Sequence, residues 1–181
     1  MSVAFSLKDE EALNSRIGHD LVCLLPRLRH YALVLCRSPA LADDLVQDTC
    51  VRALAAADSW MPGTRFDAWV FRILRNHWID VVRHNKVEAR RDDVDIEAAG
   101  GQTESGEPGI ISRFELADVC RAIDLLPADQ QEVLLLVCGQ DMTYREAADI
   151  LGVPVGTVMS RLARARKRLL ELTNGGQPTR R

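Results

Sequence analysis

The stretch TYREAADILGVPVGTVMSRLARARKRLLEL, residues 143–172, decides the fold of the carboxyl-terminal half of the chain. Thr143 and Glu146 have the spacing of a capping box, which predicts that a short helix begins there. Gly152 and Pro154 predict a sharp turn, because glycine tolerates the left-handed conformation at a helix end and proline suits the first turn of a helix. The sequence therefore predicts two helices joined by a tight turn.

The second of these helices separates apolar residues from small and cationic residues around its axis. Its inner stripe consists of Val158, Leu162, Ala165, Leu169 and Leu172. Its outer side consists of Gly156, Ser160, Ala163, Arg164 and Lys167, with Thr157, Arg161 and Arg168 on one flank and Met159 and Arg166 on the other. Small residues let a helix approach base edges, and cations contact phosphates or guanine, so the pattern predicts a DNA-binding helix-turn-helix. A solvated basic face is the simpler alternative, but the capped first helix and the glycine turn favour DNA binding.

The charge of the chain is unevenly distributed. The 181 residues have a formal net charge of −3, and their number allows one ordinary domain or two small ones. Residues 65–91 contain seven cations and three acids, and residues 143–181 contain eight cations and three acids. Between them, residues 92–118 contain eight acids and one arginine. Two basic blocks separated by an acidic one predict two surfaces that contact a polyanion and a spacer that avoids it.

The five cysteines lie at least 13 residues apart, and the four histidines show no ligand spacing with them. We therefore expect buried free thiols, and neither a metal ion nor another cofactor. The odd cysteine count, the lack of a signal peptide and the lack of an apolar run of transmembrane length predict a cytoplasmic protein without membrane insertion.

From about residue 10 to residue 57, leucines recur at helical spacing. Pro26 is expected to open a second helix within residues 10–36, and Ser38-Pro39 predicts the capped start of a helix that ends near Ala57. The predicted inner stripe of this helix is Leu41, Leu45, Thr49 or Val51, and Leu54. Its outer face is acidic through Asp43, Asp44, Gln47 and Asp48. The helix dipole alone accounts for two acids near the helix start, so partner contact by this face stays an open alternative at this point.

The segment 60–63 is expected to be a loop, and the spacing of Thr64 and Asp67 predicts a capped helix that ends near His84. The predicted buried stripe of this helix is Phe66, Trp69, Val70, Ile73, Leu74, His77 and Val81. Its opposite side carries Arg72, Arg75, Asn76, Ile79 and Arg83. Most of the aromatic residues of this region are expected in the core; unpaired bases stacking on them is the alternative.

Residues 85–109 have the acidic, glycine-containing composition of a linker. Apolar periodicity returns from Ile110 to Leu125, and a further helix is expected over 129–137. No segment alternates as a strand does. The sequence therefore predicts an all-α protein with two small domains, 1–84 and 110–181, the second containing the helix-turn-helix.

Four segments now carry a resemblance to a known family. They are ALADDLVQDTCVRAL at 40–54, FDAWVFRILRNHWIDVVR at 66–83, LPADQQEVLLL at 126–136 and TYREAADILGVPVGTVMSRLARARKRL at 143–169. Together, in this order around an acidic linker, they resemble the extracytoplasmic-function (ECF) sigma factors of bacterial RNA polymerase, in the sigma-70 superfamily. The resemblance covers roughly residues 20–172.

The resemblance implies a non-catalytic protein that binds core RNA polymerase and directs it to promoter DNA, and that an anti-sigma protein commonly holds inactive. It places polymerase contacts at Asp43, Asp44, Gln47 and Asp48. It places contacts to the −10 element at Trp60, Phe66, Arg72, Arg75, Asn76 and Arg83. It places contacts to the −35 element at Thr157, Ser160, Arg161, Arg164, Lys167 and Arg168. Many relatives have a cation where this chain has Met159, so its preferred upstream sequence is expected to differ.

Two other classes of protein compete with this interpretation. A stand-alone helix-turn-helix regulator would bind duplex DNA tightly without polymerase. A sigma-like decoy would bind an anti-sigma protein but not DNA, and the presence of Asn76, Arg164 and Lys167 argues against it. An enzyme is the least favoured class, because His19, His30, His77 and His84 are scattered and no pair of nucleophile and base stands out.

Overall fold

The computed structural model describes residues 7–61, 63–92, 119 and 121–174. The chain forms two compact units, residues 1–100 and 101–181. All regular secondary structure within the described residues is helical, which confirms the all-α prediction. None of the helices in those ranges combines the length and the apolar character needed to cross a membrane.

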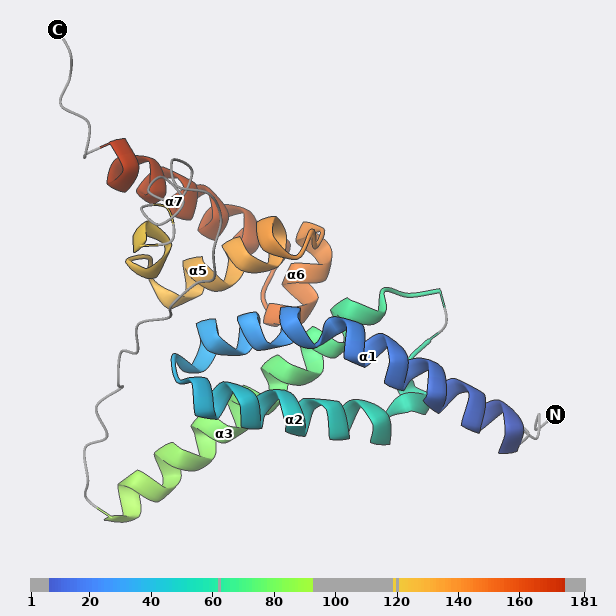
Figure 1. Ribbon diagram of the computed structural model, residues 1–181. Helices are drawn as coiled ribbons and strands as arrows, with labels where there is room; N and C mark the ends of the chain where they lie inside the picture. Colours follow the sequence, from blue (N-terminus) through green and yellow to red (C-terminus); the bar gives the residue numbers. More distant parts are fainter. Residues whose placement is uncertain (1–6, 62, 93–118, 120, 175–181) are drawn as a thin grey trace, which may run out of the picture. The chain divides into compact units, whose positions relative to one another are not determined.

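The first unit consists of α1 (Leu7–Cys36), α2 (Pro39–Ala55), the short 3-10 helix η1 (Ala57–Ser59) and α3 (Phe66–Asp92). Figure 1 shows α1 and α2 as a helical hairpin, and α3 packs against both helices. Only Arg37 and Ser38 connect α1 to α2. The Ser38 hydroxyl oxygen accepts a hydrogen bond from the Leu41 amide at 3.5 Å, and Pro39 occupies the first turn, as predicted.

Two predictions for the hairpin are wrong. Pro26 does not open a second helix but lies inside the continuous α1. A proline interrupts one backbone hydrogen bond of a helix, and α1 tolerates this because the neighbouring Leu24 and Leu28 are buried and fix both sides of the proline in the core. In α2, Leu45 is buried as expected, and of the two alternatives Thr49 is buried while Val51 is 61% exposed. Leu41 and Leu54, however, are 50% and 43% exposed. Ala42 and Ala53 face the core instead, because small side chains let α2 approach its neighbours closely.

Helix α3 is longer than predicted, because it continues past His84 to Asp92 and includes the first residues of the predicted linker. The remaining linker residues, 93–109, lie outside the described residues, as do residues 110–118. Trp69, Val70, Leu74 and His77 of the predicted stripe are buried, whereas Phe66, Ile73 and Val81 are partly exposed. The fully buried Phe71 packs edge-on against Tyr31 of α1, with 5.2 Å between ring centroids.

The second unit contains a helical turn at 121–124, α5 (Ala128–Leu134), the π-helix η2 (Leu135–Gly139), α6 (Tyr144–Leu151) and α7 (Val155–Asn174). Helix α7 packs against α5 and α6. The predicted capping box is confirmed: the Thr143 amide donates to Glu146 Oε2 at 2.7 Å, and the Glu146 amide donates to Thr143 Oγ1 at 3.2 Å. The predicted helix over 129–137 corresponds to α5 and the start of η2.

Gly152 ends α6 in the left-handed conformation, with φ at 61°. A Cβ added there meets no atom within 4 Å, so only the backbone conformation opposes a side chain. Replacing Gly152 with alanine is expected to lower the free energy of unfolding by about 1–2 kcal/mol. Urea denaturation followed by circular dichroism measures this loss. Gly156→Ala, inside α7 with equal space around it, is the control and should stabilise the helix; an equal loss in both variants would contradict the prediction.

Four of the five cysteines lie within the described residues, and all four are free thiols, as predicted. Their predicted burial is wrong for Cys23 and Cys138, which are exposed because they lie on outward helix faces. Cys36 and Cys50 are half-buried, and burial raises the pKa of both thiols. These two thiols are therefore poor nucleophiles near neutral pH.

Candidate nucleic-acid interface

Helix α7 presents a cationic outer face on an apolar base. Val158, Leu162 and Ala165 are buried against the rest of the second unit, as the inner stripe predicts. The exposed outer residues are Gly156, Met159, Ser160, Ala163, Arg164, Arg166, Lys167 and Arg168. The surface that would enter a major groove thus carries both small and cationic residues.

The arginines of α7 differ in what they already contact. Arg164 Nε donates to the Ser160 carbonyl at 3.2 Å on its own helix, and within the described residues Arg164 has no acidic partner. Arg161 forms an ion pair with Asp129 of α5, with 3.1 Å between Nε and Oδ2. Arg168 lies 3.5 Å from Glu171. Of the three, Arg164 exchanges its present contacts for DNA at the lowest cost, because it gives up no charge pair.

Helix α3 exposes a second polar stripe. Arg72, Asn76 and Arg83 are exposed at steps of four and seven residues, which places them on one side of the helix, while Arg75 is partly buried. On the opposite side the buried His77 contacts Asp48 of α2, with 3.0 Å between Nε2 and Oδ2. Asp48 is thus bound to α3, so that it is less available to a partner protein than its sequence position suggests.

The aromatic residues before α3 form a packed cluster. Trp60 is 8% exposed and packs edge-on against Phe66, with 5.6 Å between ring centroids. Phe66 in turn lies 5.7 Å from the Trp69 ring. The Trp60 indole nitrogen is buried and has no hydrogen-bond partner among the residues that the structure describes. In this conformation the buried Trp60 packs against Phe66, and the partly exposed Phe66 is the ring that a ligand can reach.

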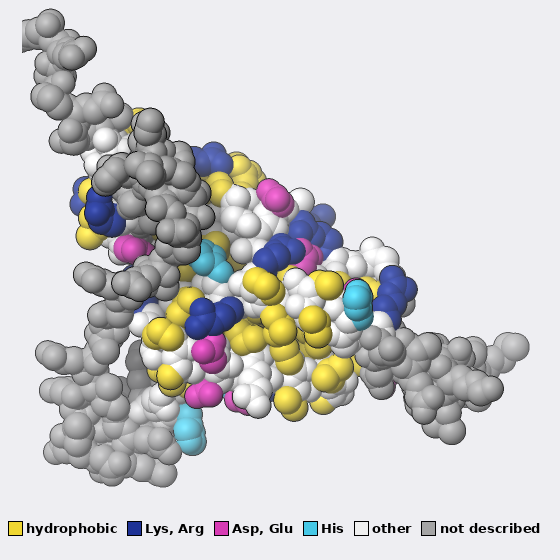
Figure 2. All heavy atoms as spheres, viewed as in Figure 1, with side chains coloured by type: hydrophobic (Ala, Val, Ile, Leu, Met, Phe, Trp, Pro, Cys, Tyr) yellow, Lys and Arg dark blue, Asp and Glu magenta, His cyan; other side chains and the backbone are white. Residues whose placement is uncertain are grey.

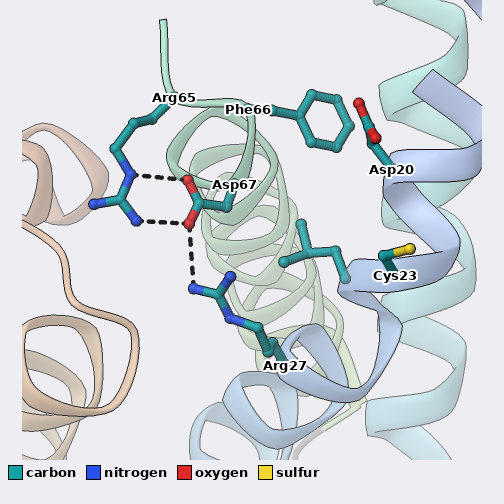
Figure 3. Close-up of a pocket in the computed structure, with 7 residues that line it drawn as sticks. Asp20, Cys23, Arg27, Arg65, Phe66 and Asp67 are labelled. Carbon is teal, nitrogen blue, oxygen red and sulfur yellow. Dashed lines mark hydrogen bonds and ion pairs between the residues drawn. The ribbon is translucent and has the colours of Figure 1, made fainter. Parts of the chain in front are cut away.

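A pocket of about 350 Å³ lies beside Phe66, between α1 and the start of α3 (Figure 3). Its lining residues are Asp20, Cys23, Leu24, Arg27, Arg65, Phe66 and Asp67. The lining combines an aromatic ring and a leucine with donors and acceptors, which is the combination that planar polar ligands need. Sequence patterns did not predict this pocket, because α1 and α3 supply its walls from positions about 40 residues apart.

Asp67 holds the pocket together. Its carboxylate accepts hydrogen bonds from Arg65 Nε at 3.0 Å, Arg65 Nη2 at 2.7 Å, and Arg27 Nη2 at 3.2 Å (Figure 3). Burial by itself would raise the pKa of Asp67, but the Arg65 hydrogen bonds and charge, the Ala68 amide and the Arg27 charge together lower it. The capping box predicted for Thr64 and Asp67 is therefore wrong. The Thr64 hydroxyl donates to the Met61 carbonyl, and the Asp67 carboxylate accepts from Arg65 and Arg27 instead.

Replacing Asp67 with asparagine is expected to lower the free energy of unfolding at pH 7 by about 1–3 kcal/mol, because two guanidinium groups lose the negative charge and one of the two acceptor oxygens that hold them. Since the pKa of Asp67 is lowered by folding, its contribution is present above the unfolded-state value of about 3.9 and is lost as the pH falls through the folded-state value. Urea denaturation at several pH values should therefore show the two proteins converging below about pH 4. Asp58→Asn, an exposed position, serves as control; a difference independent of pH would contradict the expectation.

The α1–α2 hairpin exposes apolar side chains beside the acidic face of α2. Arg29 Nε lies 2.6 Å from Asp43 Oδ1, and this exposed ion pair marks the register of the antiparallel helices. The register brings Val22 and Leu25 of α1 opposite the carboxyl-terminal half of α2, where Val51 and Leu54 are exposed. Figure 2 shows hydrophobic side chains gathered over α1 and α2. We call the surface made by Val22, Leu25, Asp44, Gln47, Val51 and Leu54 the hairpin face.

Comparison with known proteins supplies the family. Residues 22–87 match the family model for sigma-70 region 2, and residues 117–169 match that for sigma-70, region 4. The chain is 39% identical over 160 residues to the ECF RNA polymerase sigma factor EcfG of Rhodopseudomonas palustris, which spans 88% of this chain and 86% of the relative. The chain belongs to the ECF sigma factors of bacterial RNA polymerase. It is also 38% identical over 138 residues to the sigma factor CnrH of Cupriavidus metallidurans, with 72% of each protein covered.

Two solved structures resemble this ECF sigma factor. One is the sigma factor RpoE of Bartonella quintana in complex with the anti-sigma factor NepR, with a TM-score of 0.73 and 36% identity over 88% of this chain and 98% of that chain. The other is CnrH in complex with the cytosolic domain of CnrY, with a TM-score of 0.63 and 27% identity over 93% of this chain and 96% of that chain. Both contain a sigma factor bound to a second protein.

The site residues predicted for this ECF sigma factor fall into three surfaces. The structure brings Ser160, Arg164 and Lys167 together on α7, and Arg72, Asn76 and Arg83 together on α3. The predicted polymerase contacts are divided, because Asp43 pairs with Arg29 and Asp48 with His77, which leaves Asp44 and Gln47 on the hairpin face. No pattern in the sequence pointed to Arg27 or Asp129, because each contacts a residue far away in the chain.

Proposed function

We propose that this ECF sigma factor docks on core RNA polymerase through the hairpin face, captures an unpaired −10 base at the pocket beside Phe66, and recognises the −35 element with α7. Its parts are a −10 domain that runs to the end of α3 at Asp92, an acidic linker at 93–109 and a −35 domain at 110–181. The supporting observation is that a ring beside a polar pocket and a helix face that carries cations but no acid from Thr157 to Arg168 lie in different units of one chain. The ring beside the pocket suits single-stranded DNA, and the cationic helix face suits duplex DNA.

The energetics favour capture of bases over active unwinding. Separating DNA strands costs about 1.4 kcal/mol per base-pair step. A base stacked on an aromatic ring contributes about 1–3 kcal/mol. One base at Phe66 therefore offsets one or two lost steps, so the −10 domain traps bases that leave the helix spontaneously. The exposed Arg72, Asn76 and Arg83 hold the neighbouring strand by its phosphates, and Arg75 borders them.

The remaining roles follow from the same assignment. Thr157, Ser160, Arg161, Arg164, Lys167 and Arg168 contact the −35 element in the major groove. The acidic linker follows the polymerase channel through which RNA later leaves. The protein acts in the cytoplasm as a regulatory subunit, and bond formation belongs to the polymerase. An anti-sigma protein holds it inactive, a role supported by the partners in the two similar solved structures.

Polymerase docking is tested with Val51→Glu, which places a charge in the middle of the apolar part of the hairpin face. Leu41→Glu is the matched control, because it makes the same change at an exposed leucine on the α3 side of α2. The fluorescently labelled full chain is titrated with purified core polymerase, and promoter opening is then followed in the mixture. We expect Val51→Glu alone to abolish association. Failure of the wild-type chain to bind core polymerase, or tight specific duplex binding without it, would overturn the proposed function.

A further inference from the structure

We infer that Asp129 of α5 positions Arg161 for base recognition and thereby helps to determine promoter specificity, a role that rests on the function proposed above. Arg161 lies on the flank of α7, and its side chain is 23% exposed. The Asp129 side chain is 45% exposed and lies in the first turn of α5, the helix that packs against α7. Asp129 thus places a carboxylate beside the cationic flank of α7.

The geometry of the pair favours positioning over neutralisation. The contact of 3.1 Å joins Asp129 Oδ2 to Arg161 Nε, the nitrogen nearest the helix. No other polar contact of Arg161 is present in the part of the chain that the structure describes. The two terminal nitrogens therefore keep their donors, and two parallel donors are what a bidentate contact to guanine O6 and N7 requires. Because the contact with Asp129 orders the Arg161 side chain before DNA binds, Arg161 loses less conformational entropy on binding.

The carboxylate has a second effect on DNA binding. Asp129 repels phosphates wherever α7 meets duplex of any sequence, so it weakens non-specific binding. When Arg161 is directed at a base, the same carboxylate strengthens specific binding by ordering the guanidinium. Asp129 therefore acts on the ratio of specific to non-specific affinity, and its effect on base preference passes through Arg161.

A purely structural role for Asp129 makes a different prediction. An acid in the first turn of a helix is stabilised by the helix dipole, and this effect does not involve Arg161. The two roles separate in a double-mutant cycle: an effect through Arg161 disappears when Arg161 is alanine, whereas a dipole effect persists.

The experiment uses the full chain assembled with core polymerase and a promoter library randomised in the upstream element, with transcripts counted by sequencing. The variants are Asp129→Asn, Arg161→Ala and their combination, and Asp124→Asn is the control for loss of an exposed acid in the same unit. We expect Arg161→Ala to remove the preference at one base position. Asp129→Asn should weaken the preference at that same position by about three- to tenfold, less than a whole bidentate contact is worth. The double variant should match Arg161→Ala.

Each other outcome counts against the inference. An unchanged profile for Asp129→Asn, a change at other base positions, or an equal change in the Arg161→Ala background would overturn it. A wild-type chain that selects promoters while Arg161→Ala keeps the full preference would remove Arg161 as a base reader and leave the sigma-factor function intact. Absence of transcripts from every template with the wild-type chain would instead contradict the proposed function itself.

Discussion

Replacing Phe66 with alanine is expected to reduce promoter opening by about five- to 150-fold while leaving polymerase binding unchanged, because one stacked base contributes about 1–3 kcal/mol. Phe66 is the better target than Trp60. Trp60 is 8% exposed and packs under Phe66, so its removal would also leave a cavity in the first unit. Phe66 is partly exposed and lines the pocket.

Phe66→Leu and Phe66→Tyr are the matched variants for this experiment. Leucine keeps apolar volume without a stacking surface, and tyrosine keeps the ring. Opening is followed by the fluorescence of 2-aminopurine in the −10 element, on duplex templates and on templates with a mismatched bubble. We expect tyrosine to restore opening, leucine not to, and the bubble to reduce the defect of the alanine variant. Equal activity of leucine and wild type, or loss of helical signal in circular dichroism, would show that the ring is only part of the core.

Replacing Arg164 with alanine is expected to weaken use of the −35 element by about 1–3 kcal/mol, or roughly five- to 150-fold, if Arg164 forms a bidentate contact with guanine. Its present partners are the carbonyl and hydroxyl oxygens of Ser160, at 3.2 and 3.4 Å. Both lie on the outer face of α7, so little is lost when the guanidinium turns to DNA.

Arg166→Ala is the matched control. Arg166 lies on the flank of α7 that also carries Met159, and it contacts Cys138 of η2 at 3.8 Å. Transcription by the reconstituted holoenzyme is measured on promoters that differ at single upstream positions, at several salt concentrations. Loss of preference at one position supports base recognition. A uniform loss of transcription on all promoters would assign Arg164 to the DNA phosphate backbone instead. In that case the salt dependence of promoter binding should also fall by the equivalent of about one phosphate contact. Unchanged transcription from every promoter would remove it from the interface.

The sequence predicted α6, α7 and the turn between them correctly, because their signals are local. The capping box at Thr143, the left-handed Gly152 and the inner stripe of α7 each depend on residues within a turn or two of one another. Such interactions fix helix ends and helix faces before any distant part of the chain is placed. The outer face of α7 follows from the inner face by the helical repeat, so the candidate −35 residues were predictable too.

The first unit was predicted less well, because packing among its helices decides which face of each helix is buried. Leu41, Val51 and Leu54 have the character of buried residues, yet Ala42 and Ala53 occupy the core. Helical spacing identifies several possible stripes, and only packing against α1 and α3 selects among them. Pro26 was misjudged for the same reason: the buried leucines on either side keep α1 continuous.

By itself the sequence determined the helical class, the helix-turn-helix and the two cationic surfaces, since periodicity, caps and charge are properties of neighbouring residues. Only the tertiary structure decided which of the predicted site residues are already engaged. Asp48 is held by His77, Arg161 by Asp129, and Arg27 by Asp67, each across about 30 to 40 residues and between separate helices. Ion pairs and pockets of this kind have no sequence signature, because they depend on how helices pack and not on how residues repeat.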